Sequence, residues 1–267
     1  MASPIAVTDV DDPRIADYRL LKERHLNTQG GRFIAESELV VRRLLASGLR
    51  VHSILATPVR LGTLSDVLPD AGDNHNDDPP SFPVYVADQP TMDRIAGFHV
   101  HRGCLAVGER PAHPRIPPGA RTVVVLEDVV YIDNIGSMVR NAAALGADAL
   151  CLSPQCADPF YRKGIRTSLG SVFTLPIVRF ARWPEDLIAL RAEGFTLVAA
   201  TPAPDATPLH ALPRPPRLAL LLGAEGPGLT PATMALADHR VSIPMSPAAD
   251  SLNIATAGAI LLYTLRQ

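Results

Sequence analysis

Residues 218–222 limit how this chain can fold more than any other segment, because five consecutive apolar residues leave a strand no polar face. Such a strand must be covered on both sides, which is typical of a parallel sheet between layers of helices. Other short apolar runs in the second half alternate with helical patterns, as βαβ units require. The sequence therefore predicts an α/β fold with a parallel sheet. Strands are expected at 123–126, 149–152, 197–200, 218–222 and 240–243, and helices at 136–145, 183–191, 230–236 and 252–265.

The first half predicts a smaller α/β unit. Its expected strands are 33–34, 51–56, 84–87 and 104–107, and its expected helices begin at Asp12-Pro13 and cover 36–46 and 92–96. Residues 69–83 are acidic and rich in proline, which is typical of a loop. Four prolines within 111–120 favour an extended connector. We therefore place an N-terminal domain at 1–110, a Pro-rich linker at 111–120 and a second domain at 121–267.

The final expected helix, 252–265, has almost no polar face. A helix that is apolar on every side is normally buried on every side. Because it ends the sequence, no later element can cover it, and we expect it to form a subunit interface in a homodimer. Docking in a crevice of the same chain is the alternative.

Composition excludes several classes of protein. The net charge of −2 and the pI near 6.4 do not indicate a general nucleic-acid-binding surface, so any such surface must be a local patch. Of the 25 Lys and Arg residues only Lys22 and Lys163 are lysine, which leaves arginine as the main cation for gripping phosphate.

The cysteines and the N-terminus indicate a cytoplasmic protein. Cys104, Cys151 and Cys156 lack CxxC spacing, so we expect neither a disulfide framework nor a metal site. Residues 1–12 lack the pattern of a secretory signal. The longest apolar run, 254–265, is too short to span a bilayer, so no membrane partner is expected.

Three separated segments stand where an apolar run meets a polar loop, the place where α/β proteins build their sites. The first opens a helix, with Asn134 as a candidate cap and Arg140 about one and a half turns further on. Residues 223–229 carry glycines in the order G-x-x-G-x-G, which differs from the dinucleotide fingerprint G-x-G-x-x-G. In the third, 243–245 ends a strand and Ser251 is a candidate N-cap. Taken singly, each also fits a capped helix or a tight turn without a ligand.

Together the three segments resemble the SpoU/TrmH-type RNA 2′-O-ribose methyltransferases of the SPOUT superfamily, over residues 121–267. The first family motif, N-x-G-x-x-x-R-[NT]-A, is matched by Asn134, Gly136, Arg140, Asn141 and Ala142. The second, G-x-E-x-x-G-[LM], is matched by Gly223, Glu225, Gly228 and Leu229. The third, I-P-M followed by S-L-N, is matched by 243–245 and 251–253. The D-P pair that usually precedes the first motif is replaced by Tyr131 and Ile132.

The resemblance implies a trefoil-knotted parallel-sheet methyltransferase domain that binds S-adenosylmethionine in its knot and dimerises through its final helix. Knots are rare exceptions to ordinary chain topology, and periodicity does not predict one. The cofactor-binding residues implied are Leu222, Gly223, Glu225, Gly228, Ile243, Met245 and Leu252. The catalytic residues implied are Arg140, Glu225, Asn134, Asn253 and Ser251.

The N-terminal half resembles, more weakly, the RNA-binding domain often fused to this family, which is similar to small ribosomal proteins. The residues that carry this likeness are 32–36, near the usual F-x-x-E-G, and His101-Arg102-Gly103, near the usual H-Q-G. Arg102 adds a cation there. A second basic stretch begins at Tyr161 and suits phosphate contact and base stacking. The RNA-binding candidates are Arg102, Arg162, Lys163, Arg166 and Ser168; a turn and a solvated loop are the alternatives.

The reaction implied is transfer of a methyl group from a sulfonium to a ribose 2′-oxygen. A sulfonium is a good leaving group, so such a site must chiefly align the reacting atoms. A guanidinium holds its proton far above neutral pH, so we assign Arg140 to alkoxide stabilisation or phosphate binding rather than to general base catalysis. Glu225 would orient Arg140 or the ribose, and Ser251 and Asn253 would donate or accept hydrogen bonds.

Ribosomal RNA is the favoured substrate, because the N-terminal domain offers a second RNA-binding surface. A tRNA 2′-O-methyltransferase and a non-catalytic RNA-binding or ribosome assembly factor on the same fold are the alternatives. A nucleotide-dependent oxidoreductase is disfavoured, because the sequence lacks G-x-G-x-x-G and the acidic ribose ligand.

Overall fold

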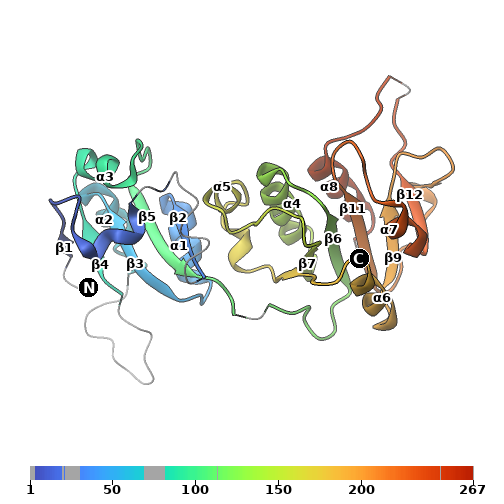
Figure 1. Cartoon of the computed structure of the whole chain (residues 1–267), viewed down its shortest axis with the longest axis horizontal. Coiled ribbons are helices and arrows are strands. Elements are labelled where there is room, and N and C mark those ends of the chain that lie inside the picture. The colour runs from blue at the N-terminus through green and yellow to red at the C-terminus, as the bar shows by residue number, and fades with distance from the viewer. Residues whose placement is uncertain are drawn as a thin grey trace. The chain divides into compact units, whose positions relative to one another are not determined.

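A computed structural model describes residues 4–19, 21, 31–68, 82–112, 114–246 and 248–266. The chain forms two compact units, which Figure 1 shows with their labelled elements. Unit 1 consists of Met1–Ala112 and Phe160–Phe173, and unit 2 of His113–Pro159 and Thr174–Gln267. The first point of division falls within the proline-rich stretch 111–120. Most of the expected acidic loop, 69–81, lies outside the described residues.

Unit 1 is built on a five-stranded mixed sheet with the order β1-β4-β3-β5-β2. Strands β2 and β3 both run antiparallel to β5, while β4 runs parallel to β3 and to β1. The strands are β1 (Ile5–Ala6), β2 (Arg32–Glu36), β3 (Val51–Ala56), β4 (Val84–Val86) and β5 (Cys104–Glu109). The helices are η1 (Pro13–Tyr18), α1 (Glu38–Ala46), α2 (Pro58–Leu64), α3 (Gln89–Ala96), α5 (Arg162–Thr167) and η3 (Ser171–Phe173).

Residues 160–173 belong to unit 1 although they follow strands of unit 2 in the sequence. The ring of Phe33 in β2 lies 5.3 Å from that of Phe160 and 5.2 Å from that of Phe173. Gly108 in β5 makes room for this cluster, because a Cβ there would lie 2.4 Å from the Phe33 ring. Arg162 also donates to the buried carboxylate of Glu36 at 2.9 Å. Buried aromatic contacts and a partly buried ion pair therefore hold this segment in unit 1.

Unit 2 is built on a seven-stranded sheet with the order β10-β12-β9-β11-β6-β7-β8, and every pair in it is parallel. The predicted parallel sheet is thereby confirmed. The strands are β6 (Thr122–Glu127), β7 (Ala149–Leu152), β8 (Ile177–Arg179), β9 (Thr196–Ala200), β10 (Thr207–Pro208), β11 (Leu218–Gly223) and β12 (His239–Ser242). The helices are α4 (Ile132–Ala144), α6 (Glu185–Ala192), η4 (Leu209–Ala211), α7 (Pro231–Leu236) and α8 (Ile254–Thr264).

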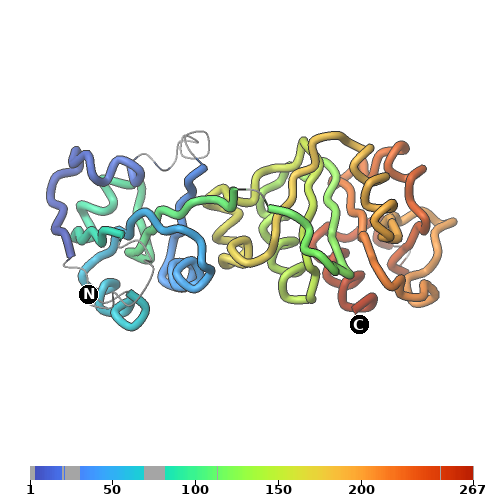
Figure 2. Tube along the Cα trace, turned by 90° about the horizontal axis from the view of Figure 1, so that it is seen from below, coloured from blue at the N-terminus to red at the C-terminus, as the bar shows by residue number. Residues whose placement is uncertain are grey.

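Helices cover both faces of this sheet, as the apolar run 218–222 predicted. Ala219 and Leu221 point into a core with Leu187 and Leu190 of α6. Leu222 lies on the opposite face, next to Gly258 of α8. Helix α8 packs against α4 on that face (Figures 1 and 2). Alternate residues of a single strand thus serve two apolar layers, which is why none of them is polar.

Two predicted helix caps were wrong. Helix α4 begins at Ile132, so Asn134 lies inside its first turn, and Tyr131 occupies the N-cap position without a side-chain bond. Helix α8 begins at Ile254, and its N-cap is Asn253 rather than Ser251. The cap predictions rest on neighbouring residues alone. The side chains of Asn134 and Asn253 also bond to each other across a long stretch of sequence.

Helix α8 is only partly buried within a single chain. Leu261 and Leu262 are buried, but Ile260 is 36% exposed and Tyr263 is 55% exposed. These two residues are three positions apart and lie on one side of the helix. A single chain therefore leaves one apolar face of α8 uncovered.

We expect Phe33→Ala to loosen residues 160–173, because it removes the ring that Phe160 and Phe173 contact. Large-to-small changes at a buried phenylalanine destabilise a protein by about 3–5 kcal/mol. Hydrogen exchange in α5 should accelerate markedly. Leu39→Ala, on an exposed face of α1, is the matched control and should have little effect. Unchanged exchange in α5 would contradict the role given to Phe33.

Candidate functional site

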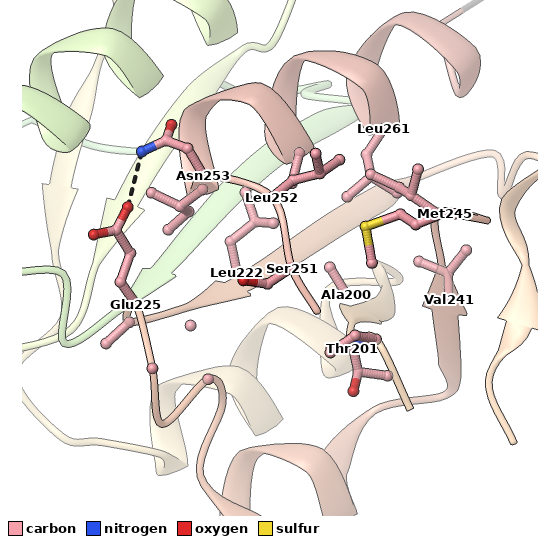
Figure 3. Close-up of a pocket in the computed structure, with 18 residues that line it drawn as sticks. Ala200, Thr201, Leu222, Glu225, Val241, Met245, Ser251, Leu252, Asn253 and Leu261 are labelled. Carbon is pink, nitrogen blue, oxygen red and sulfur yellow. Dashed lines mark hydrogen bonds between the residues drawn. The ribbon is translucent and has the colours of Figure 1, made fainter. Parts of the chain in front are cut away.

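A cavity of about 530 Å³ lies in unit 2, where β9, β11 and β12 end. This is the carboxyl edge of the parallel sheet, where α/β proteins bind ligands. Figure 3 shows Asn253 and Glu225 on one side of the cavity, and Met245, Val241 and Leu261 on the other. The lining residues are Ala200, Thr201, Pro202, Leu222, Gly223, Ala224, Glu225, Gly226, Gly228, Val241, Ile243, Met245, Ser251, Leu252, Asn253, Ile254, Ala257 and Leu261.

The structure brings the second and third sequence motifs together in this cavity. Three of the five expected catalytic residues, Glu225, Ser251 and Asn253, line it. All of the expected cofactor residues line it as well, namely Leu222, Gly223, Glu225, Gly228, Ile243, Met245 and Leu252. Asn134 and Arg140 of the first motif are not among the lining residues.

The loop after β11 folds back on itself at a place that only glycine permits. A Cβ on Gly223 would lie 2.1 Å from the carbonyl carbon of Gly228 and 2.2 Å from the amide nitrogen of Leu229. The Gly228 amide donates to the Ala224 carbonyl at 2.9 Å. Gly226 and Gly228 have φ angles of +88° and +72°, the left-handed region that favours glycine. At its glycines the loop therefore presents main-chain groups to the cavity, and Glu225 is the long side chain that it adds.

The side-chain amide of Asn253 joins three segments. Its Oδ1 accepts from the amides of Ala255 and Thr256, at 3.0 and 3.4 Å, and so caps α8. Its Nδ2 donates to Oε1 of Glu225 at 2.8 Å, the bond drawn in Figure 3, and to Oδ1 of Asn134 at 2.9 Å. Because the cap fixes which end of the amide faces the helix, the NH2 group must face Glu225 and Asn134.

The electrostatic character of the cavity is simple. Among the described residues that line it, Glu225 is the one charged side chain. Leu222, Val241 and Leu261 provide buried apolar wall, and Thr201 and Ser251 add hydroxyl groups. A carboxylate beside apolar surface favours a ligand that combines a positive charge with apolar parts.

Part of the wall was missed by the sequence prediction. Ala200, Thr201 and Pro202 follow β9, and Ile254, Ala257 and Leu261 belong to α8. Most of these residues carry no distinctive chemistry, so no motif marks them. The residues that follow β9 could have been predicted from the position of that strand, because β9 is one of the strands that end at this edge of the sheet.

Arg140 lies on α4 and is exposed. The same helix contacts α8 through Asn141, whose Nδ2 donates to the Ala255 carbonyl at 2.8 Å, and through Met138, which packs against Gly258. Arg140 is about 100° of helical rotation away from Asn141. Its side chain is therefore directed away from the α4–α8 contact.

The RNA-binding candidates all lie in unit 1, and they differ in what they offer. Arg102, Lys163 and Arg166 are exposed. The guanidinium of Arg162 is paired with Glu36 and stacked 4.2 Å from the centre of the Phe98 ring. Ser168 is fully buried, and its hydroxyl donates to the Ile165 carbonyl, so this conformation does not present it to a ligand.

The described residues carry neither a metal cluster nor a membrane span. No group of three or more His, Cys, Asp or Glu side chains among them could hold a metal ion. No helix in the same part of the chain is long and apolar enough to cross a membrane. Cys104, Cys151 and Cys156 are buried free thiols, and burial raises the pKa of all three.

Comparison with known proteins identifies the family. The sequence profile of the SpoU rRNA Methylase family matches residues 121–263, which include all three motifs and the whole cavity. The chain belongs to this family. It is therefore a methyltransferase of the SpoU type, as the sequence motifs implied.

Relatives of this SpoU methylase match it over nearly its whole length. An uncharacterised tRNA/rRNA methyltransferase of Mycobacterium tuberculosis is 43% identical, covering 96% of this chain and 90% of that protein. A 23S rRNA (guanosine-2′-O)-methyltransferase of Bacillus subtilis is 28% identical, covering 97% and 98%. The AdoMet-bound crystal structure of an rRNA methyltransferase from Sinorhizobium meliloti has a TM-score of 0.80 and 25% identity, covering 97% of this chain and 96% of that one.

We expect Gly223→Ala to disrupt the loop after β11 in this SpoU methylase, because the new methyl group would overlap main-chain atoms that cannot move aside. Forcing extra atoms into packed structure costs about 1–3 kcal/mol. Titration calorimetry should show a large loss of S-adenosylmethionine affinity. Gly226→Ala is the control: its φ of +88° makes a side chain strained there, which is not so at Gly223, but a Cβ at Gly226 meets nothing within 4 Å. Equal affinities for the two variants would contradict the steric argument.

Proposed function

We propose that this protein transfers a methyl group from S-adenosylmethionine to a ribose 2′-hydroxyl of ribosomal RNA. The observation that carries the proposal is the cavity itself, which gathers the residues expected for the cofactor around a single carboxylate. Membership of the SpoU rRNA methylase family supports the reaction. The match to a 23S rRNA 2′-O-methyltransferase, which covers 98% of that protein, supports ribosomal RNA as the substrate. The cytoplasm is the compartment we expect for it.

The residues present fit the cofactor. The missing Cβ of Gly223 lets main chain approach main chain, which leaves a loop of backbone donors and acceptors for a nucleoside. Leu222, Ile243, Met245 and Leu252 supply apolar contact, and Glu225 supplies a charge opposite to that of a sulfonium. Bound there, S-adenosylmethionine would supply an electrophilic methyl group.

Arg140 acts on the acceptor rather than on the cofactor. A guanidinium is a hydrogen-bond donor without an acceptor site, so we do not assign Arg140 the removal of the hydroxyl proton. It stabilises the negative charge that develops on the ribose oxygen, or it holds the neighbouring phosphate. Arg140 does not line the cavity of its own chain, and we assign it to the site of a partner protomer.

A homodimer provides that partner. The uncovered apolar face of α8, with Ile260 and Tyr263, is the surface we assign to the interface. Helix α4, which carries Arg140, packs against α8, so a second copy on this face comes close to both helices. Asn134, Ser251 and Asn253 then orient groups within each site.

The trefoil knot is part of the same proposal. After β12 the chain returns to α4, where Asn253 bonds to Asn134, and on this path it passes the loop after β11, where it bonds to Glu225. Such a path is what threading of the chain past that loop requires. The knot would enclose the cofactor with backbone from two segments.

Unit 1 serves as the RNA-binding domain in this proposal. Arg102, Lys163 and Arg166 are exposed cations that can meet phosphates. Arg162 and Ser168 hold the segment that presents Lys163 and Arg166, through the bonds to Glu36 and Ile165. Ribosomal RNA is favoured because its folded surface is large enough to contact both units.

We expect Arg140→Ala to abolish methyl transfer to ribosomal RNA while S-adenosylmethionine affinity stays within about threefold, since Arg140 lies outside the cavity. Methylation would be followed by transfer of a labelled methyl group, and affinity by calorimetry. Mixing Arg140→Ala with Gly223→Ala protomers should restore activity, because one site of a mixed dimer has an intact loop and an intact arginine. If the mixed protomers remain inactive, Arg140 acts in the site of its own chain. If Arg140→Ala alone loses cofactor binding and methyl transfer to the same extent, the role of Arg140 is structural.

We expect Ile260→Glu to convert the dimer to monomers, because it places a charge within an apolar interface. Light scattering coupled to size-exclusion chromatography would report the mass, and activity should fall with it. Ile188→Glu, at an exposed isoleucine on α6, is the control and should leave the mass unchanged. A monomeric wild-type protein at micromolar concentration would contradict the assignment.

A further inference from the structure

Glu127 is a buried carboxylate that the proposed reaction does not use. It ends β6, where it lies opposite Gly223 of β11, and it is 1% exposed. It is not among the residues that line the cavity. None of the described Arg, Lys or His side chains forms an ion pair with it. A buried charge without a cation is costly, so the groups that compensate it indicate what it holds.

Four neutral donors surround the carboxylate. Oε1 accepts from Nε1 of Trp183 at 2.7 Å, from Oγ1 of Thr230 at 2.8 Å and from Oγ1 of Thr233 at 2.7 Å. Oε2 accepts from the main-chain amide of Thr230 at 2.9 Å. The hydroxyl groups can turn to donate or accept, but the indole and the amide can only donate. Each carboxylate oxygen therefore faces one N–H group whose role is fixed.

These contacts secure both ends of the loop that forms one wall of the cavity. At its start, Gly223 is paired with Glu127 in the sheet. At its end, Thr230 is held by the Glu127 side chain through both its amide and its hydroxyl. Thr230 is also the N-cap of α7, where its hydroxyl accepts from the Thr233 amide. A single residue thus anchors 223–229 at the strand and at the helix.

We propose that Glu127 is a positioning residue for S-adenosylmethionine binding: its carboxylate holds residues 223–229 in the shape that the cofactor requires. The inference rests on the proposed function, because the cofactor of that reaction is the ligand that the loop receives. Glu127 acts only through the loop, so its loss should affect cofactor affinity at temperatures where the protein is fully folded.

Glu127→Gln tests this role with little change of shape. In one orientation the new NH2 group faces the Thr230 amide, and in the other it faces the Trp183 indole, so two donors oppose each other either way. An unsatisfied buried donor costs enough to weaken S-adenosylmethionine binding about tenfold or more. We expect this loss by titration calorimetry at 25 °C, together with faster hydrogen exchange in 223–229. Glu185→Gln, at an exposed glutamate that begins α6, is the control and should match wild type.

Trp183→Phe provides a rescue that an unspecific loss of stability would not show. With the indole N–H removed, the glutamine side chain introduced by Glu127→Gln can turn its carbonyl to the Thr230 amide. Its NH2 group then faces the two threonine hydroxyls, which can accept. We expect the double variant to bind S-adenosylmethionine more tightly than Glu127→Gln alone, and to exchange more slowly in 223–229. The rescue is also expected if Glu127→Gln alone fails to fold, which circular dichroism would reveal.

The outcomes separate this inference from the proposed function. If wild type binds the cofactor, and Glu127→Gln binds within twofold of it or the double variant shows no recovery, the positioning role is refuted. If wild type does not bind S-adenosylmethionine, the proposed function fails. In that case, faster exchange in 223–229 in Glu127→Gln and its reversal by Trp183→Phe still support the anchoring of the loop, and their absence refutes it.

Discussion

The side-chain amide of Asn253 is the interaction on which the rest of the site depends. Its oxygen is committed to the first turn of α8, so its NH2 group has one direction in which to point. That direction holds Glu225, from the loop after β11, and Asn134, from α4. The segments are 28 and 119 residues from Asn253 in sequence. Movement of any one of them would break a bond to another, so Asn253 links the three sequence motifs.

Two further features shape the site, namely the glycines of the loop after β11 and the placement of two carboxylates. Gly223 and Gly228 let two stretches of main chain touch, which places peptide groups where side chains would otherwise stand. Glu225 is the charged group inside the cavity, while Glu127 is kept behind the loop and satisfied by neutral donors. One carboxylate thus faces the cavity and the other lies behind the loop. None of the described residues that line the cavity is arginine or lysine, so a cationic ligand would meet an attractive field there.

The sequence predicted the bounds of secondary-structure elements best where every residue of the element is buried. The strand at 149–152 was predicted to the residue and that at 218–222 to within one, because side chains covered on both faces leave an unbroken apolar run. Short elements such as β10 and α2 gave no such signal. The caps at Asn134 and Ser251 were wrong because Asn134 bonds to Asn253, 119 residues away, and Asn253 itself caps α8. Thr201 and Ala257 were missed in the cavity because topology alone brings them there.

The placement of residues 160–173 has a consequence for how such proteins can evolve. The chain leaves unit 2 after Pro159 and returns to it at Thr174, so unit 1 is completed by a segment inserted within the methylase half. If an unrelated domain replaced the N-terminal half, Phe160 and Phe173 would lose their contacts with Phe33. The two halves are therefore not interchangeable parts, and inherited changes on one side of this aromatic cluster must be matched on the other.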